Sequence, residues 1–153
     1  MIQFQDGLVD SGDGGTLERA MREEISELYT GLDLQGPDMP KAGPEELNPP
    51  KGVFLVGYEE GVATCCGGLK RLDDETCELK RMYVIPAARG RGVARILLTA
   101  LEDRARELGY GVARLDTGPR QPGAQHLYES AGYIEIPNFN ANPVATYFGE
   151  KRL

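Results

Sequence analysis

An apolar segment, a glycine-rich turn and the start of an amphipathic segment follow one another in Tyr83-Val84-Ile85-Pro86-Ala87-Ala88-Arg89-Gly90-Arg91-Gly92-Val93-Ala94. The apolar spacing after the turn predicts a helix over 92–108. A turn between a strand and a helix directs several backbone N–H groups to one point, where the helix dipole also favours an anion. Gly90 and Gly92 let the backbone approach a ligand closely. Arg89 and Arg91 add positive charge, so the turn is predicted to bind a diphosphate.

Two other phosphate-binding patterns do not fit this turn. A P-loop would need Lys and then Ser or Thr around the last glycine, where this chain has Val93-Ala94. A dinucleotide-binding turn would need a third Gly or Ala in place of Arg95, and it would follow the first strand of the fold. A turn that only joins a strand to a helix would explain Gly90 but not the two arginines.

Strand and helix patterns alternate along the rest of the chain. Besides 92–108, helices are predicted over 16–29, with Thr16 as the N-cap, and over 122–131. The proline-rich segment 36–50 is predicted to be a functional loop with a helical turn at 45–47. Strands are predicted at 2–9, 53–58, 62–72, 76–85, 112–117, 133–136 and 147–152. This order predicts one α/β domain over 1–153, with a mixed sheet and a central, parallel β-α-β unit.

Composition excludes several classes of protein. The 153 residues suit one domain, and 17 basic against 24 acidic residues give a net charge of −7, which argues against a nucleic-acid binder with a broad basic surface. Three cysteines and one histidine do not suit a disulfide framework or a zinc site, so no metal is expected. The chain begins without a signal-peptide pattern and lacks an apolar run of membrane-spanning length. We therefore expect a reduced, cytoplasmic protein with no membrane partner.

The residues of this turn resemble those of the GNAT superfamily of acyl-CoA N-acyltransferases. The motif of that family is Arg or Gln, two residues, Gly, one residue and then Gly or Ala, and Arg89, Gly92 and Ala94 match it in register. The resemblance extends to the flanking segments 78–84 and 127–133 and covers about residues 53–153. It implies a GNAT-like, mostly antiparallel sheet flanked by helices and the use of acetyl-CoA.

The resemblance also implies where the cofactor binds. The pyrophosphate would lie on the turn, formed by Arg89, Gly90, Arg91, Gly92, Val93 and Ala94. The pantetheine arm would bind the backbone of the preceding strand at Met82, Tyr83 and Val84. Many members have an Asn seven residues before the helix tyrosine, and this chain departs from them with Gln121, whose longer side chain could make a similar contact.

Transfer of an acyl group to an amine requires a neutral amine. A lysine-like amine with a pKa of about 10.4 costs about 4.6 kcal/mol to deprotonate near pH 7, whereas an α-amino group with a pKa of about 7.8 costs about 1 kcal/mol. Glu78 is the candidate general base, because apolar residues flank the polar part of its strand and would bury it partly, and because the resemblance implies a Glu base there, acting directly or through water. The polar run 78–81 breaks strand alternation and predicts a bulge that opens the sheet. The alternative is that Glu78 only pairs with Lys80 or Arg81 at a sheet edge.

Tyr128 is the candidate general acid. Its phenol stays protonated near pH 7 and could give a proton to the departing thiolate. The alternative is an aromatic residue of the core on the helix over 122–131. His126 lies off the face of Tyr128 and is predicted to be a solvated helix residue.

The remaining candidates concern nucleophiles and the acceptor. Cys65, Cys66 and Cys77 lie in predicted strands and are expected to be small apolar fillers, so a covalent acyl-cysteine route is not favoured. Acceptor contacts are placed by analogy at Tyr29, in the loop 36–50, and at Asn140 and Asn142, although turn formation also explains the asparagines.

These residues together predict an N-acetyltransferase that moves an acetyl group from acetyl-CoA to the amine of a small molecule or an amino acid, by direct attack in a ternary complex. One alternative is an acyl-CoA-binding sensor or partner module without turnover. Another is a toxin that acetylates aminoacyl-tRNA, for which a basic strip would serve, although we expect the strip to bind the cofactor phosphates. Its members are Lys80, Arg81, Arg89, Arg91 and Arg95. Exposed strand ends make a homodimer plausible.

Overall fold

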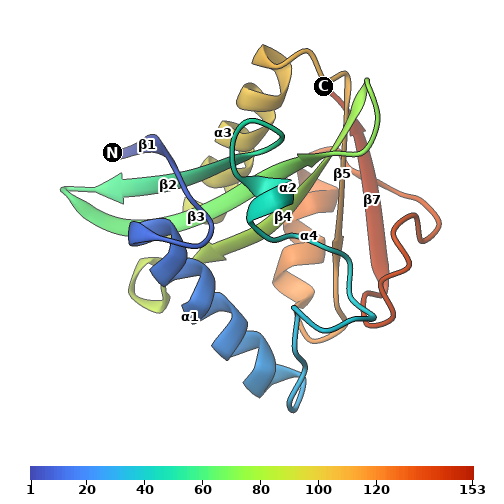
Figure 1. Ribbon diagram of the computed structural model, residues 1–153, viewed down its shortest axis with the longest axis horizontal. Coiled ribbons are helices and arrows are strands. Elements are labelled where there is room, and N and C mark those ends of the chain that lie inside the picture. The colour runs from blue at the N-terminus through green and yellow to red at the C-terminus, as the bar shows by residue number, and fades with distance from the viewer.

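Seven strands form one sheet in the order β1-β2-β3-β4-β5-β7-β6 in the computed structural model, which describes residues 1–153 (Figure 1). The only parallel pair is β4 with β5, so the predicted mixed, mostly antiparallel sheet is confirmed. The strands are β1 (Ile2–Gly7), β2 (Val53–Glu59), β3 (Val62–Arg71), β4 (Thr76–Val84), β5 (Val112–Thr117), β6 (Ile134–Glu135) and β7 (Tyr147–Arg152). The helices are α1 (Gly12–Leu28), α2 (Pro44–Leu47), the 3-10 turn η1 (Pro86–Ala88), α3 (Val93–Glu107) and α4 (Pro122–Ser130).

Helices cover both faces of the sheet (Figure 1). α1 and α2 lie on one face, over a core that includes Met21, Leu47 and Phe54. α3 and α4 lie on the other face, over a core that includes Leu97 and Tyr128. The helix α3 joins the parallel strands β4 and β5, which confirms the predicted β-α-β unit.

The predicted start of the first helix is wrong. α1 begins at Gly12 with Ser11 as its N-cap, one turn before Thr16, whose hydroxyl donates to the Gly12 carbonyl at 3.2 Å. The glycines in this first turn allow the helix to approach the segment that follows β1 closely. A Cβ at Gly14 would overlap the Leu8 carbonyl oxygen, and one at Gly15 would lie 2.8 Å from the Asp10 carbonyl carbon. Close packing therefore overrides the weak helix propensity of glycine.

A bulge in β4 opens the middle of the sheet, as the polar run 78–81 predicted. The pairing of β3 with β4 shifts by one residue between Cys66 and Gly68, and Arg81 on the facing strand has a φ of 59°. A non-glycine residue rarely takes a left-handed conformation, and such strain is concentrated at functional sites. β4 and β5 pair only from Thr76 to Glu78 and then separate. Their separation leaves a gap between the two strands.

Candidate active site

The loop that leads into α3 presents a row of free backbone donors. None of the amide N–H groups from Gly90 to Arg95 has a hydrogen-bond acceptor in the protein. Gly90 and Gly92 have φ values of 80° and 79°, and Gly92 caps α3 without a side chain. A Cβ at either glycine would meet nothing within 4 Å. The loop is therefore an open cradle of donors at a helix N-terminus, an arrangement that binds phosphate groups.

The arginines beside this cradle are paired with other side chains. Arg89 lies 2.8 Å from Glu24, and its Nε donates to the Val84 carbonyl at 2.9 Å. Arg91 lies 2.9 Å from Glu59. These ion pairs are at the surface, where such contacts contribute little free energy and exchange readily.

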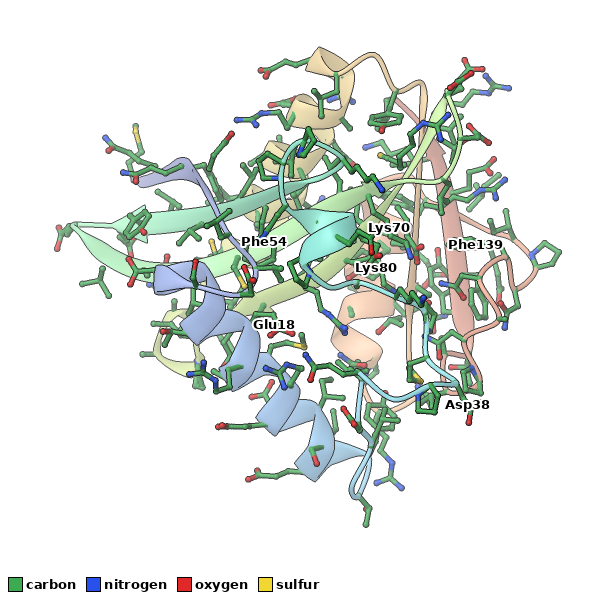
Figure 2. All side chains as sticks on the ribbon, viewed as in Figure 1. Glu18, Asp38, Phe54, Lys70, Lys80 and Phe139 are labelled. Carbon is green, nitrogen blue, oxygen red and sulfur yellow. The ribbon has the colours of Figure 1, made fainter.

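The predicted basic strip is not one surface. Arg89, Arg91 and Arg95 are near the cradle, but Lys80 and Arg81 are buried side chains of β4 that pair with acidic groups. Figure 2 shows Lys80 on the same face of the sheet as Glu18 of α1. The expectation that all five residues bind cofactor phosphates is therefore wrong for Lys80 and Arg81. The bulge directs Arg81 toward α1, where it meets Glu18.

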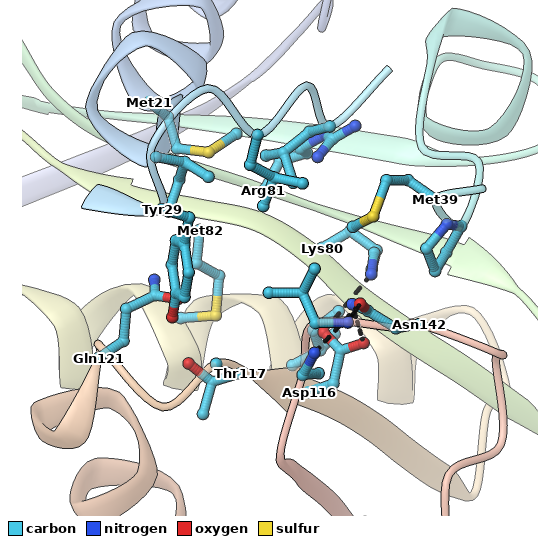
Figure 3. A pocket seen from close by; sticks show the side chains of 18 of the residues that line it. Met21, Tyr29, Met39, Lys80, Arg81, Met82, Asp116, Thr117, Gln121 and Asn142 are labelled. Carbon is cyan, nitrogen blue, oxygen red and sulfur yellow. Dashed lines mark hydrogen bonds and ion pairs between the residues drawn. The ribbon is translucent and has the colours of Figure 1, made fainter. Parts of the chain in front are cut away.

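A cavity with about 790 Å³ of empty space lies where β4 and β5 separate (Figure 3). Its walls come from α1, the loop that follows it, β4, β5, α4 and the segment before β7. Five of the predicted site residues line it: Tyr29, Met82, Gln121, Tyr128 and Asn142. Tyr83 lies in the core under α1, and Val84 packs against the core under α3.

Tyr128 lies at the side of this cavity formed by α4. Its side chain is 7% exposed, and its hydroxyl donates to the Met82 sulfur at 3.8 Å, which is a weak acceptor. Burial raises the pKa of the Tyr128 phenol, and the charge of Asp116 acts in the same direction. The hydroxyl is therefore a proton-bearing donor with no strong partner, at the edge of a cavity.

Tyr29 joins α1 to the loop that precedes α4. Its hydroxyl donates to the Gln121 side-chain oxygen at 3.0 Å and accepts from the Arg120 amide at 3.1 Å. A Cβ at Gly118 would overlap this hydroxyl. Tyr29 and Gln121 thus form a bridge across one side of the cavity.

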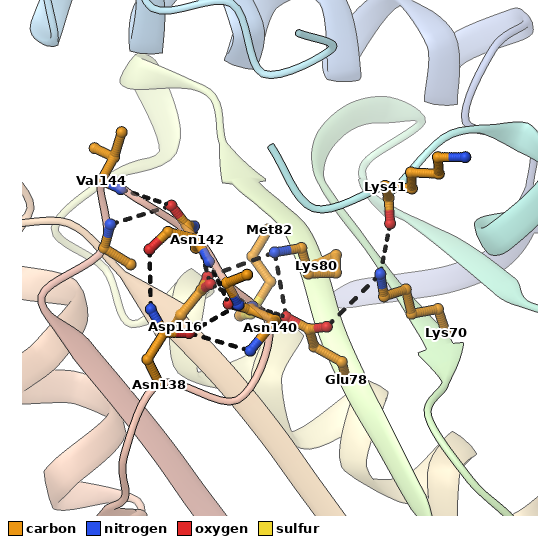
Figure 4. A network of polar contacts seen from close by, with 12 residues as sticks. Lys41, Lys70, Glu78, Lys80, Met82, Asp116, Asn138, Asn140, Asn142 and Val144 are labelled. Carbon is orange, nitrogen blue, oxygen red and sulfur yellow. Dashed lines mark hydrogen bonds and ion pairs between the residues drawn. The ribbon is translucent and has the colours of Figure 1, made fainter. Parts of the chain in front are cut away.

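Glu78 lies behind the cavity wall, in a network of polar contacts (Figure 4). Its side chain is fully buried, with Oε2 2.8 Å from the Asn140 amide nitrogen and 3.2 Å from the Lys80 ammonium. Its Oε1 lies 3.8 Å from the Lys70 ammonium and accepts no hydrogen bond. Glu78 does pair with Lys80, but in the interior rather than at a sheet edge, and it reaches the cavity only through its neighbours.

Asp116 is the carboxylate of this network that lines the cavity. Its Oδ2 accepts hydrogen bonds from Asn140 at 2.7 Å and Asn142 at 3.0 Å, and its Oδ1 lies 3.5 Å from the Lys80 ammonium. The segment before β7 thus orients Asp116, and Asn140 connects Asp116 to Glu78. Asn140 does not line the cavity, although Asn142 does.

Sequence reasoning missed Asp116, Lys80 and Arg81 as residues of this cavity. Asp116 and Arg114 share one face of β5, while Ala113 and Leu115 face the core under α3. The position of Asp116, a charged residue near the end of a strand of the β-α-β unit, could have predicted that it lies at the site. Lys80 and Arg81 were assigned to the basic strip, but the direction in which their side chains point depends on the bulge.

The other reactive side chains lie elsewhere. His126 is exposed on α4, as predicted. The three cysteines are buried and free, and burial raises the pKa of each thiol, to about 12 for Cys77. Thiolates are therefore disfavoured at all three positions.

An open α/β sheet with a donor cradle at the helix of its β-α-β unit and a cavity between two separating strands defines an acyltransferase type of fold and site. Residues 18–133 match the model of the acetyltransferase (GNAT) family, and the chain belongs to that family. No helix in the structure has the length and apolar character that crossing a membrane requires.

Individual relatives agree with this assignment. An uncharacterised N-acetyltransferase of Schizosaccharomyces pombe is 31% identical over 127 residues, which cover 81% of this chain and 78% of the relative. An IAA acetyltransferase of Azospirillum brasilense is 37% identical over 126 residues, which cover 77% of this chain and 82% of the relative. A crystal structure from Klebsiella pneumoniae, assigned as an acyl-CoA N-acyltransferase, superposes with a TM-score of 0.78 at 27% identity and covers 100% of this chain and 98% of its own.

Proposed function

We propose that this protein transfers an acetyl group from acetyl-CoA to the amino group of a small molecule or an amino acid. The observation that carries the proposal is the row of free amide N–H groups from Gly90 to Arg95, at the end of a strand that also lines the cavity. Acetyl-CoA would supply a pyrophosphate for this row and a thioester for the cavity. The names of the relatives support the same reaction type.

Direct transfer requires both substrates in one cavity. The acceptor nitrogen forms a bond to the acyl carbon as the bond from that carbon to sulfur breaks, while one proton leaves the amine and one reaches the sulfur. Because the Tyr128 phenol is a neutral donor, we assign it to the sulfur of the thioester, where it stabilises the developing thiolate. The buried, protonated state of the cysteines favours direct transfer over a covalent acyl-cysteine.

Binding and deprotonation of the acceptor amine are assigned to Asp116 and to Glu78, which lies behind Asp116. Asp116 lines the cavity and can hold the acceptor ammonium or take its proton. Glu78 can take part in proton removal only through Lys80, Asn140 or a water molecule, because its side chain is fully buried. Asp116 is thus proposed to contact the acceptor and Glu78 to act as a positioning residue and indirect base.

Two carboxamide variants separate these roles. Asp116→Asn is expected to raise the KM for the acceptor at least about tenfold, whereas Glu78→Gln is expected to lower kcat about 10–100-fold with little change in KM. Glu78→Gln should also shift the acid limb of the pH–rate profile. Steady-state kinetics from pH 5 to 10 make the comparison.

Glu150→Gln is the matched control, because Glu150 pairs with Arg114 at 2.8 Å on the neighbouring strand but does not line the cavity. It should leave both constants unchanged. A Glu78→Gln protein with normal thermal stability and an unchanged kcat at every pH would remove Glu78 from the proton path.

The proposed function is tested on the wild-type protein with acetyl-CoA and a panel of amines and amino acids. Acetyl-CoA at 100 times its Kd should stabilise the fold by about 2.7 kcal/mol, which corresponds to a rise in Tm of about 5–10 °C. At least one amine should accelerate the release of free thiol. Absence of thermal stabilisation would refute the proposal. Stabilisation with slow thiol release that no amine accelerates would instead favour a binding module without turnover.

A further inference from the structure

A second cavity, with about 850 Å³ of empty space, lies between α1 and the segment 34–46. It shares Leu34, Met39, Pro40 and Arg81 with the first cavity, so the two spaces meet at these residues. Four cationic and three acidic side chains line it: Arg19, Arg22, Lys41 and Arg81, and Asp10, Glu18 and Glu46. The charged side chains of this lining therefore have an excess of one cation.

The acidic side chains of this cavity already have partners. Both oxygens of Glu18 accept from the Arg22 Nε at 2.9 Å. Asp10 accepts from the Asn48 amide at 2.9 Å, and Glu46 accepts from the Gly43 backbone N–H at 2.9 Å. Glu18, the carboxylate nearest Arg81, is thus already engaged by Arg22 through both of its oxygens, and Asp10 and Glu46 accept only from neutral groups.

Arg81 is the side chain left without a matched acceptor. It is 7% exposed, its Nε is buried without a hydrogen bond, and its guanidinium makes no hydrogen bond to any protein group. Its nearest carboxylate oxygen is Glu18 Oε2, at 3.6 Å. Leaving a buried charged donor without a hydrogen bond is costly, and here the cost falls on a residue whose backbone is also strained. Burial lowers the pKa of Arg81, yet an arginine stays charged.

We infer that Arg81 binds a carboxylate of the acceptor, so that the acceptor is an amino acid or another amine that carries a carboxylate. The inference rests on the proposed function. A guanidinium offers a planar pair of donors that matches a carboxylate. Arg81 and Asp116 line the same cavity, so one molecule can place its amino group at Asp116 and its carboxylate at Arg81 (Figure 3). The single negative charge of a carboxylate also matches the excess of one cation in the second cavity.

The first test needs no variant. Matched pairs of L-amino acids and their carboxamides differ in structure only at the carboxylate, and although the carboxamide has the more easily deprotonated amine, the wild-type protein is expected to use the acid member at least about tenfold better in kcat/KM. The readout is thiol release at a fixed acetyl-CoA concentration. Equal use of both members, in a protein that acetyl-CoA stabilises, would overturn the inference and leave the proposed function standing. No stabilisation by acetyl-CoA would instead refute the proposed function.

The second test removes the guanidinium. Arg81→Met should raise the KM for the acid member at least about tenfold, leave the KM for the carboxamide nearly unchanged, and preserve the thermal shift with acetyl-CoA. Arg152→Met is the matched control, because Arg152 is exposed at the end of β7, outside both cavities. If Arg81→Met does not fold, Arg81→Lys keeps the charge but not the paired donors, and it should show a smaller loss of the same preference. A variant that folds and retains the full preference for the acid would overturn the inference.

Discussion

Gly92→Glu is expected to abolish the thermal stabilisation of the protein by acetyl-CoA. The substituted side chain would enter the open space above the loop, where a Cβ meets no protein atom within 4 Å. It would bring a negative charge to the row of donors from Gly90 to Arg95 and repel a pyrophosphate. The shift of about 5–10 °C expected for the wild-type protein should fall to near zero, as measured in a thermal melt with saturating acetyl-CoA.

Gly109→Glu is the control for the backbone cost of this change. Gly109 lies just beyond the other end of α3, has a φ of 92° and also has nothing within 4 Å of a Cβ. Both variants should lose about 1–2 kcal/mol of unfolding free energy from the left-handed conformation. Only Gly92→Glu should lose the response to acetyl-CoA. A full response in Gly92→Glu would place the pyrophosphate elsewhere.

Tyr128→Phe is expected to lower kcat about 100-fold while the KM for acetyl-CoA and the acetyl-CoA thermal shift change little. The variant keeps the packed ring and removes a hydroxyl whose only protein partner is the Met82 sulfur at 3.8 Å. Positioned proton donors typically contribute about 10²–10⁴ in rate. Because burial raises the pKa of this phenol, it stays protonated from neutral to moderately alkaline pH, so the wild-type rate should show no alkaline decline caused by Tyr128.

Tyr147→Phe provides the matched comparison. Tyr147 is buried, its hydroxyl has no hydrogen-bond partner, and it does not line the cavity. Removing that hydroxyl should leave kcat unchanged. If Tyr128→Phe retains wild-type turnover over the whole pH range, Tyr128 serves only as a core aromatic.

Local patterns accounted for most of the fold. The apolar spacing of α3 between two strand patterns predicted the β-α-β unit, and the polar run in β4 predicted the bulge, because each depends on neighbours within a few residues. The first turn of α1 was predicted wrongly, since Gly14 and Gly15 serve a close approach to the end of β1 that composition alone does not reveal.

The sequence by itself determined the family, the order of elements and the donor cradle at Gly90 to Arg95, because strand, turn and helix are contiguous in the chain. Only the tertiary structure decided which charges meet in the cavities. Asn140 donates a hydrogen bond to Glu78, which is 62 positions away in the sequence. Arg81 lies beside Glu18 because its own backbone takes a strained, left-handed conformation. Contacts between distant segments depend on the separation of β4 from β5 and on the bulge, and no local pattern specifies the partner of a buried charge.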